Sequence, residues 1–172
     1  SLIKNWPKGV VKVSLLLGHK GYSKDLLKKY IKSGWLESLG YGAYKLAGDS
    51  IDWWGGINAI QAEGNSSIHP AGRVALILQG NSDDQLQDLF QVNLFGGLEE
   101  RLPKWFTDQD WKVTVSYIQT KLFGDDTKKY LSDCEMQNVK IKVSAPEMAS
   151  MEMLHLVPKG QSFDEAMKIM EG

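Results

Sequence analysis

Four lysines near the start of the chain are spaced so that they could bind phosphate. Residues 23–34 read SKDLLKKYIKSG, and at about 100° per residue a helix gathers Lys24, Lys28, Lys29 and Lys32 on an arc of roughly 140°. Ammonium groups on one helix face neutralise phosphates whatever the base sequence, so the spacing indicates a nucleic-acid interface. A solvated lysine face on a structural helix is the alternative, and this stretch alone does not decide between the two.

Acidic side chains could instead hold a divalent metal that activates water for hydrolysis. The candidates are the adjacent pairs at 83–84, 99–100 and 125–126, and Glu135 with Lys140 and Lys142. No pair has the spacing of strand-borne ligands, and surface placement explains each. His19, His69 and His155 have no second ligand three or four residues away, and Cys134 has no nearby histidine. We therefore expect no catalytic residue, no metal and no cofactor.

The elements around the four lysines predict a winged helix-turn-helix. Residues 11–19 predict a short buried helix, and Ser23 can cap the lysine-bearing helix that follows a glycine turn. Residues 35–39 and 43–46 then predict two strands joined by a turn at 40–42. In a winged helix the second helix enters the major groove and the hairpin touches backbone or minor groove.

Charge divides the chain in the same way. Residues 1–50 carry nine lysines against three acidic residues, a net charge of +6, whereas residues 51–172 carry 11 basic against 18 acidic residues, a net charge of −7. The basic part is the plausible nucleic-acid surface. We expect a winged-helix domain over residues 1–48 and a second domain over 49–172.

The second domain is predicted to be α+β with a small sheet. Helices are expected at residues 53–62, 70–79, 102–106, 146–156 and 163–170, the last capped by Ser162, and strands at 92–95, 112–117 and 139–143. The tryptophans and Phe106 could stack single-stranded bases, but their spacing favours core packing.

The cysteine content and the lengths of the apolar runs indicate the compartment in which the protein acts. The chain has one cysteine, Cys134, which cannot form an internal disulfide and fits a reducing cytoplasm. No apolar run approaches the roughly 18 residues needed to cross a bilayer, so no membrane partner is expected.

Distinctive motifs occur in order along the whole chain. They are WLESLGYGAYK at 35–45, DWWGGINAI at 52–60, HPAGRVALILQG at 69–80, LFG at 94–96, LPKWF at 102–106 and SAPE at 144–147. This series resembles the AbiEi family of type IV antitoxins, which are transcriptional autorepressors of abortive-infection systems.

The resemblance implies a winged helix that binds inverted repeats in double-stranded DNA of its own promoter. It also implies a second domain that counteracts a nucleotidyltransferase-like toxin without a tight direct complex. The DNA contacts that it implies are Lys24, Lys28, Lys29 and Lys32 on the recognition helix and Tyr41, Tyr44 and Lys45 in the wing. The family often has a basic residue where Tyr41 stands, and its members continue past residue 172, so we expect the second domain to be truncated at its C-terminus.

We thus expect a cytoplasmic, non-catalytic repressor and antitoxin. Two other classes stay open. One is a metal-dependent DNA-processing enzyme whose acidic domain binds a divalent cation. The other is a protein-interaction module that silences a toxin directly while its basic helix is incidental.

Overall fold

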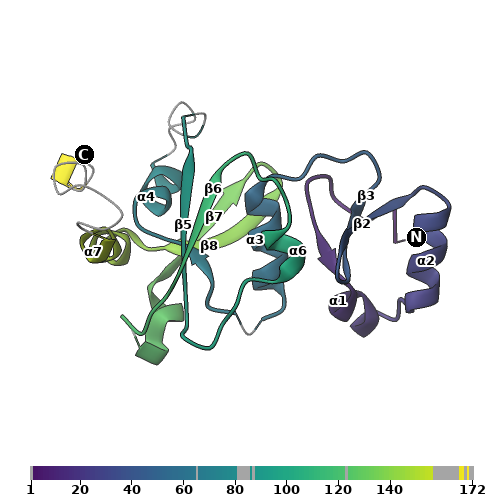
Figure 1. Ribbon diagram of the computed structural model, residues 1–172, viewed down its shortest axis with the longest axis horizontal. Coiled ribbons are helices and arrows are strands. Elements are labelled where there is room, and N and C mark those ends of the chain that lie inside the picture. The colour runs from purple at the N-terminus through teal and green to yellow at the C-terminus, as the bar shows by residue number, and fades with distance from the viewer. Residues whose placement is uncertain are drawn as a thin grey trace. The chain divides into compact units, whose positions relative to one another are not determined.

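The structure is a computed structural model that describes residues 2–64, 66–80, 86, 88–122, 124–156, 167–168 and 170 (Figure 1). Ser162 and most of the helix expected over 163–170 lie outside these residues. The chain forms two compact units. The first is Ser1–Ser66, Leu102–Trp111 and Glu135–Lys140, and the second is Ser67–Arg101, Lys112–Cys134 and Ile141–Gly172. Residues 1–48 lie inside the first unit, and a domain boundary at residue 48 stays a prediction.

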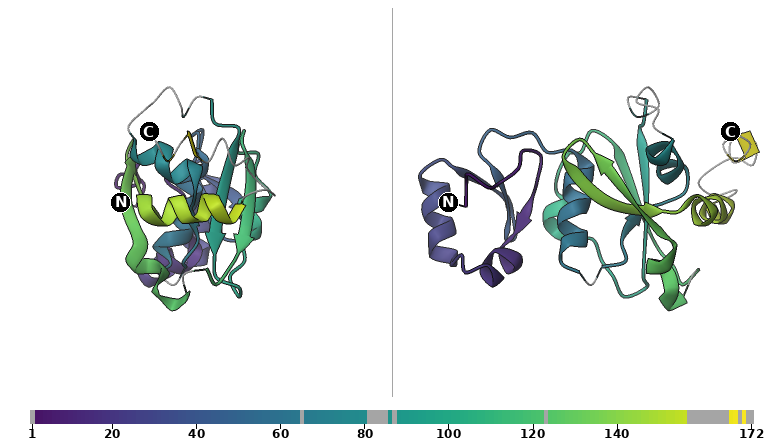
Figure 2. Two further views of the ribbon diagram at one scale, coloured as in Figure 1. Left: turned by 90° about the vertical axis from the view of Figure 1, so that its left-hand side faces the viewer. Right: turned by 180° about the vertical axis from the view of Figure 1, so that it is seen from behind.

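The first unit begins with a winged helix-turn-helix, which confirms the expected fold. Its elements are β1 (Lys12–Val13), α1 (Ser14–His19), α2 (Lys24–Lys32), β2 (Leu36–Gly40) and β3 (Ala43–Leu46). The strands are antiparallel and pair in the order β1-β3-β2. Figure 2 shows α2 running beside this sheet.

Local chemistry explains where these helices begin and end. The Ser23 hydroxyl accepts a hydrogen bond from the Leu26 N–H at 3.2 Å, so Ser23 is the expected N-cap of α2. Gly34, at φ +77°, follows the end of α2. The expectation of a helix over all of residues 11–19 was wrong at its start. Helix α1 begins only at Ser14, because Val13 pairs with Ala43 of the hairpin. This strand pairing takes up backbone hydrogen-bonding groups of the residues just before the helix.

Two further helices complete the first unit. They are α3 (Trp53–Ala62), with the expected bounds, and α6 (Lys104–Thr107), which begins two residues later than expected because Pro103, in an extended conformation, is its N-cap. Phe106 stacks on Trp111 with ring centroids 4.9 Å apart. A Cβ on Gly56 would lie 2.7 Å from the Phe106 ring, so only glycine allows this close approach. The aromatic residues of the LPKWF motif thus build a core, as their spacing indicated.

The remaining strands and helices belong to the second unit, apart from residues Glu135–Lys140 at the turn of its hairpin, which are part of the first unit. These elements are β4 (His69–Pro70), α4 (Arg73–Gln79), β5 (Gln91–Gly96), β6 (Thr114–Gln119), η1 (Gly124–Tyr130), β7 (Leu131–Met136), β8 (Val139–Ser144) and α7 (Pro146–Leu156). The three strands β4-β5-β6 form one sheet, with β4 and β5 antiparallel and β5 and β6 parallel, and β7 pairs with β8. The α+β class with small sheets is confirmed.

Two expectations for this unit were wrong in part. The helix expected from residue 70 begins at Arg73, because His69 and Pro70 pair with Phe95 and Leu94 of β5. Strand β7 was not expected, since its sequence LSDCEM is polar and only Met136 is buried. Pairing with β8, in which buried apolar residues alternate with exposed lysines, creates β7, and that pairing is not a local property of the β7 sequence.

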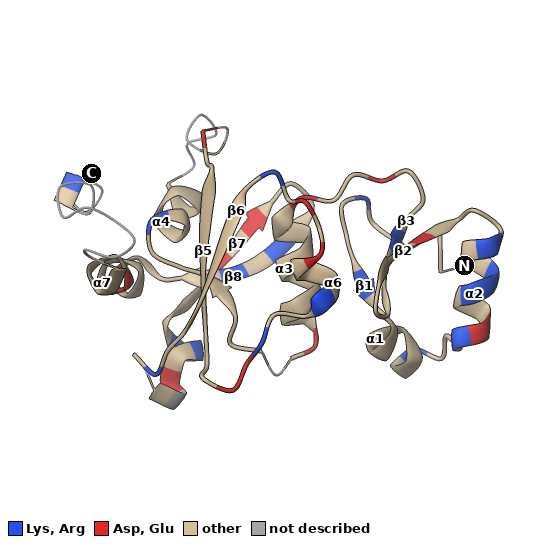
Figure 3. Cartoon of the chain, in the orientation of Figure 1, with Lys and Arg blue, Asp and Glu red and all other residues tan. Residues whose placement is uncertain are grey.

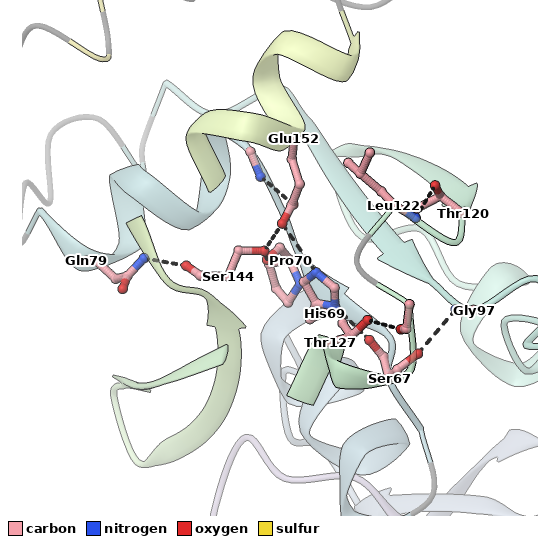
Figure 4. Close-up of polar contacts among 12 residues, drawn as sticks. Ser67, His69, Pro70, Gln79, Gly97, Thr120, Leu122, Thr127, Ser144 and Glu152 are labelled. Carbon is pink, nitrogen blue, oxygen red and sulfur yellow. Dashed lines mark hydrogen bonds and ion pairs between the residues drawn. The ribbon is translucent and has the colours of Figure 1, made fainter. Parts of the chain in front are cut away.

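A buried carboxylate joins four segments of the second unit (Figure 4). Glu152 of α7 has no exposed surface, and it accepts hydrogen bonds from the Ser144 hydroxyl and from the Gly72 N–H, the latter at 3.1 Å. The Nε2 atom of His69 lies 3.6 Å from its Oε1 atom. The Nδ1 atom of His69 lies 2.6 Å from the Ser67 carbonyl, which can only accept, so Nδ1 carries a proton. The HPAG and SAPE motifs therefore meet at one structural carboxylate.

Replacing Glu152 by Ala should lower the free energy of unfolding by about 3–5 kcal/mol, because it strips a buried polar group from its partners. Urea unfolding followed by tryptophan fluorescence measures this loss. The matched control is Glu147→Ala on the same helix, where the exposed side chain contributes at most about 1 kcal/mol through the helix dipole. Equal losses in the two variants would show that Glu152 does not anchor α7.

Candidate nucleic-acid interface

The lysines of α2 form one exposed face. Lys24, Lys28, Lys29 and Lys32 are all exposed, and the opposite side of the helix buries Leu27 in the core of the first unit. Figure 3 shows the Lys and Arg positions, in blue, along much of the ribbon of α2. The structure therefore brings together the four lysines that the sequence had placed on one arc.

Most lysines of this face are not paired with an acidic side chain among the described residues. Lys28 lies 3.9 Å from Asp25, and both side chains are more than three-quarters exposed, at 79% and 87%. Such a surface ion pair contributes little and exchanges readily with another anion. Lys24, Lys29 and Lys32 form no ion pair with any residue that the structure describes. The helix thus presents ammonium groups that can bind phosphate.

A shallow hollow of about 580 Å³ lies between α1 and the start of α2. Its lining is Ser14, Leu15, Gly18, His19, Gly21, Tyr22, Ser23 and Lys24. Leu15 is 58% exposed there, although it belongs to an apolar stretch that was expected to be buried. Reasoning from the sequence missed this exposed part of α1.

The wing places its three predicted contacts in different environments. Tyr41 stands at the tip, 70% exposed, with φ +47° in the left-handed region. Tyr44 is half-buried and packs against the core of the first unit. Of the two tyrosines, only Tyr41 has its ring at the exposed end of the hairpin.

Lys45 is held inside the wing by its neighbours. Its ammonium lies 3.1 Å from the Glu37 carboxylate and donates to the Asp49 carbonyl at 2.7 Å. The Gly48 N–H and then the Lys45 ammonium lower the pKa of Glu37, so this carboxylate stays charged beside Lys45. A contact of Lys45 with DNA stays a prediction, and the observed contacts give it a structural role at the base of the hairpin.

The acidic pairs do not assemble into a site within the described residues. No group of three or more His, Cys, Asp or Glu side chains that could hold a metal ion occurs among them. Glu100 holds the Ser67 backbone N–H and hydroxyl, each at 2.8 Å from one of its oxygens, so its carboxylate has a structural role. Asp83 and Asp84 lie outside the described residues.

Cys134 is half-buried, with Sγ 3.7 Å from the Leu78 carbonyl, and burial raises the pKa of its thiol. A thiol in this setting is a poor nucleophile. Among the described helices, none is both long enough and apolar enough to cross a bilayer.

A short two-helix turn, a three-stranded sheet and an exposed basic second helix define a winged-helix regulator. The chain belongs to the AbiEi antitoxin family. A model of the N-terminal domain of the transcriptional regulator AbiEi antitoxin matches residues 1–85. A model of the AbiEi antitoxin transcriptional regulator of type IV toxin–antitoxin systems matches residues 90–172. The resemblance seen in the motifs is confirmed, and the family descriptions name a regulator and antitoxin.

Among solved structures, the chain is similar to the RV2827C protein from Mycobacterium tuberculosis. The two are 16% identical with a TM-score of 0.55, and the match covers 99% of this chain and 69% of that one. At this identity the likeness shows the fold alone. A comparison with curated protein sequences gives no match.

Replacing Gly42 by Ala should lower the free energy of unfolding by about 1–2 kcal/mol. Gly42 has φ +82°, and an added Cβ would lie 2.7 Å from the Ser14 hydroxyl, so the hairpin would have to move away from α1. The control is Gly18→Ala in α1, where an added Cβ meets nothing within 4 Å. That variant should gain about 0.5–1 kcal/mol from helix propensity. Thermal or urea unfolding of both proteins checks the opposite signs.

Proposed function

We propose that this protein is a transcriptional autorepressor that binds inverted repeats in its own promoter and acts as an antitoxin. The observation that carries the proposal is the exposed four-lysine face of α2 beside a wing. Helix α2 has nine residues; an α-helix with its side chains is about 10–12 Å across, and the major groove is about 12 Å wide. The helix therefore fits the groove with its lysine face inward.

The two ends of α2 would then contact different parts of the DNA. Recognition helices contact base edges with their N-terminal residues, which here are Lys24 and Asp25. A lysine can donate to guanine O6 and N7, and an aspartate can accept from cytosine N4. Lys28, Lys29 and Lys32 would bind backbone phosphates. Tyr41 at the hairpin tip would touch backbone or minor groove.

The antitoxin part of the proposal rests on the family. The protein would counteract a nucleotidyltransferase-like toxin without a stable direct complex, and the repressor would act in the cytoplasm. No catalytic step is assigned to either unit, and the contacts described for Glu100, Glu152 and Cys134 are structural.

The first test is fluorescence anisotropy with duplex DNA from upstream of the gene against scrambled duplex, over a salt series. If Lys28, Lys29 and Lys32 neutralise phosphates, log affinity should fall against log salt with a slope of about −2.7, near −0.9 per contact. Lys28→Ala and Lys32→Ala should each flatten the slope by about 0.9. We expect tighter binding to the upstream duplex than to the scrambled one.

The matched control is Lys129→Ala. Lys129 is 73% exposed and pairs with Asp126 three residues earlier, as Lys28 pairs with Asp25. It should leave the slope unchanged. A slope that neither Lys28→Ala nor Lys32→Ala alters would remove α2 from the interface. Cleavage of the duplex in Mg²⁺ would favour a DNA-processing enzyme, and failure to bind either duplex would favour a protein-interaction module.

A further inference from the structure

The tip of the wing is held by a segment that lies far away in the sequence. Residues Leu102–Trp111 belong to the same compact unit as the winged helix. The Gln109 side chain donates to the Leu39 carbonyl of β2 at 3.2 Å. The Nζ atom of Lys104 lies 4.9 Å from the centroid of the Tyr41 ring. The hairpin is therefore braced by α6 and by Gln109, which follows it, and does not stand alone.

Tyr41 occupies a backbone conformation that a tyrosine rarely adopts. At φ +47° followed by Gly42 at φ +82°, it fills the first central position of a tight hairpin turn, where Asn, Asp or Gly is preferred. Strained residues of this kind are held by their surroundings and cluster at functional sites. Here the strained position carries an exposed ring, and that ring lies against the Lys104 ammonium.

Lys104 supplies the positive charge that the tip itself lacks. Residues 40–43 read GYGA and contain no charged side chain. Lys104 is 61% exposed, and its ammonium also lies 3.0 Å from Asp108, which is 47% exposed. The hydrogen bond to Asp108, followed by that to Tyr41, raises the pKa of Lys104, so the side chain is fully charged at neutral pH.

We propose that α6 completes the DNA-binding surface, with Lys104 binding a backbone phosphate at the wing and Tyr41 acting as the positioning residue that holds its ammonium. This inference rests on the proposed function and extends it to a residue outside the winged helix. A phosphate can take the place of Asp108, because an exposed ion pair is weak and exchangeable. Asp108 then competes with DNA for the same ammonium.

The experiment uses the whole chain and a fluorescein-labelled mixed-sequence duplex, since a phosphate contact does not depend on sequence. Lys104→Ala should flatten the salt slope by about 0.9, and Lys104→Arg should keep it. Asp108→Asn should tighten binding at low salt, because it frees the ammonium and removes a repelling carboxylate. The matched control is Lys142→Ala, whose ammonium is likewise 3.0 Å from an aspartate, Asp133, and 58% exposed.

The positioning role of Tyr41 has its own readout. Tyr41→Phe keeps the ring under the ammonium and should keep the affinity. Asparagine is preferred at this turn position, so Tyr41→Asn should leave the protein's unfolding midpoint unchanged or raise it. The Kd for DNA should nevertheless increase about two- to fivefold, because the Lys104 ammonium loses its contact with the aromatic ring. A loss of affinity that accompanied a loss of stability would count against a positioning role.

The outcomes separate this inference from the proposed function. If Lys28→Ala flattens the slope and Lys104→Ala does not, α2 binds DNA and the extension to α6 is wrong. If Lys142→Ala flattens the slope as much as Lys104→Ala, the effect is one of total charge and the inference also fails. If the unmodified protein binds no duplex at any salt concentration, the proposed function and the inference fall together.

Discussion

The burial of Leu27 fixes how the basic helix is turned, and the candidate interface depends on it. Leu27 is 1% exposed and packs with Leu17 and Leu36 in the core of the first unit. Once this side chain points inward, helical geometry places the lysines of α2 on the outer side. The positive face is thus a consequence of apolar packing, and the lysines do not need contacts of their own to be presented.

That core is small, and the rest of the first unit supports it. A domain of about 60 residues buries only about 60% of the surface that its unfolded chain exposes, so a domain of this size is marginally stable. Trp6 and Leu2 join the core from the start of the chain. Gln109, just after α6, contacts the hairpin at Leu39, and Lys104 of α6 contacts it at Tyr41. A wing whose tip is held from outside loses less conformational freedom when it meets DNA, because its geometry is already set.

The second unit depends on a polar interaction in its interior. Glu152 has no exposed surface and takes hydrogen bonds from the Ser144 hydroxyl and the Gly72 N–H, with His69 alongside. A histidine, a serine and a glutamate in one cluster could suggest catalysis. Here the serine hydroxyl points at the carboxylate in a fully buried site, so the arrangement joins α7 to β8 and to the turn before α4. The HPAG and SAPE motifs, which carry part of the family resemblance, therefore have a structural role.

The sequence by itself determined the features that depend on neighbours along the chain. The cap at Ser23, the end of α2 before Gly34, the bounds of α3 and α7, the lysine arc and the positive first fifty residues all follow from local spacing and composition. Tertiary structure decided what depends on partners distant in sequence. Pairing with β3 and β5 moved the starts of α1 and α4, and pairing with β8 created β7. Glu37 and Asp49 engaged Lys45, and α6 brought Lys104 to Tyr41. Charge and periodicity show which residues can bind phosphate, and only packing shows which of them are left free to do so.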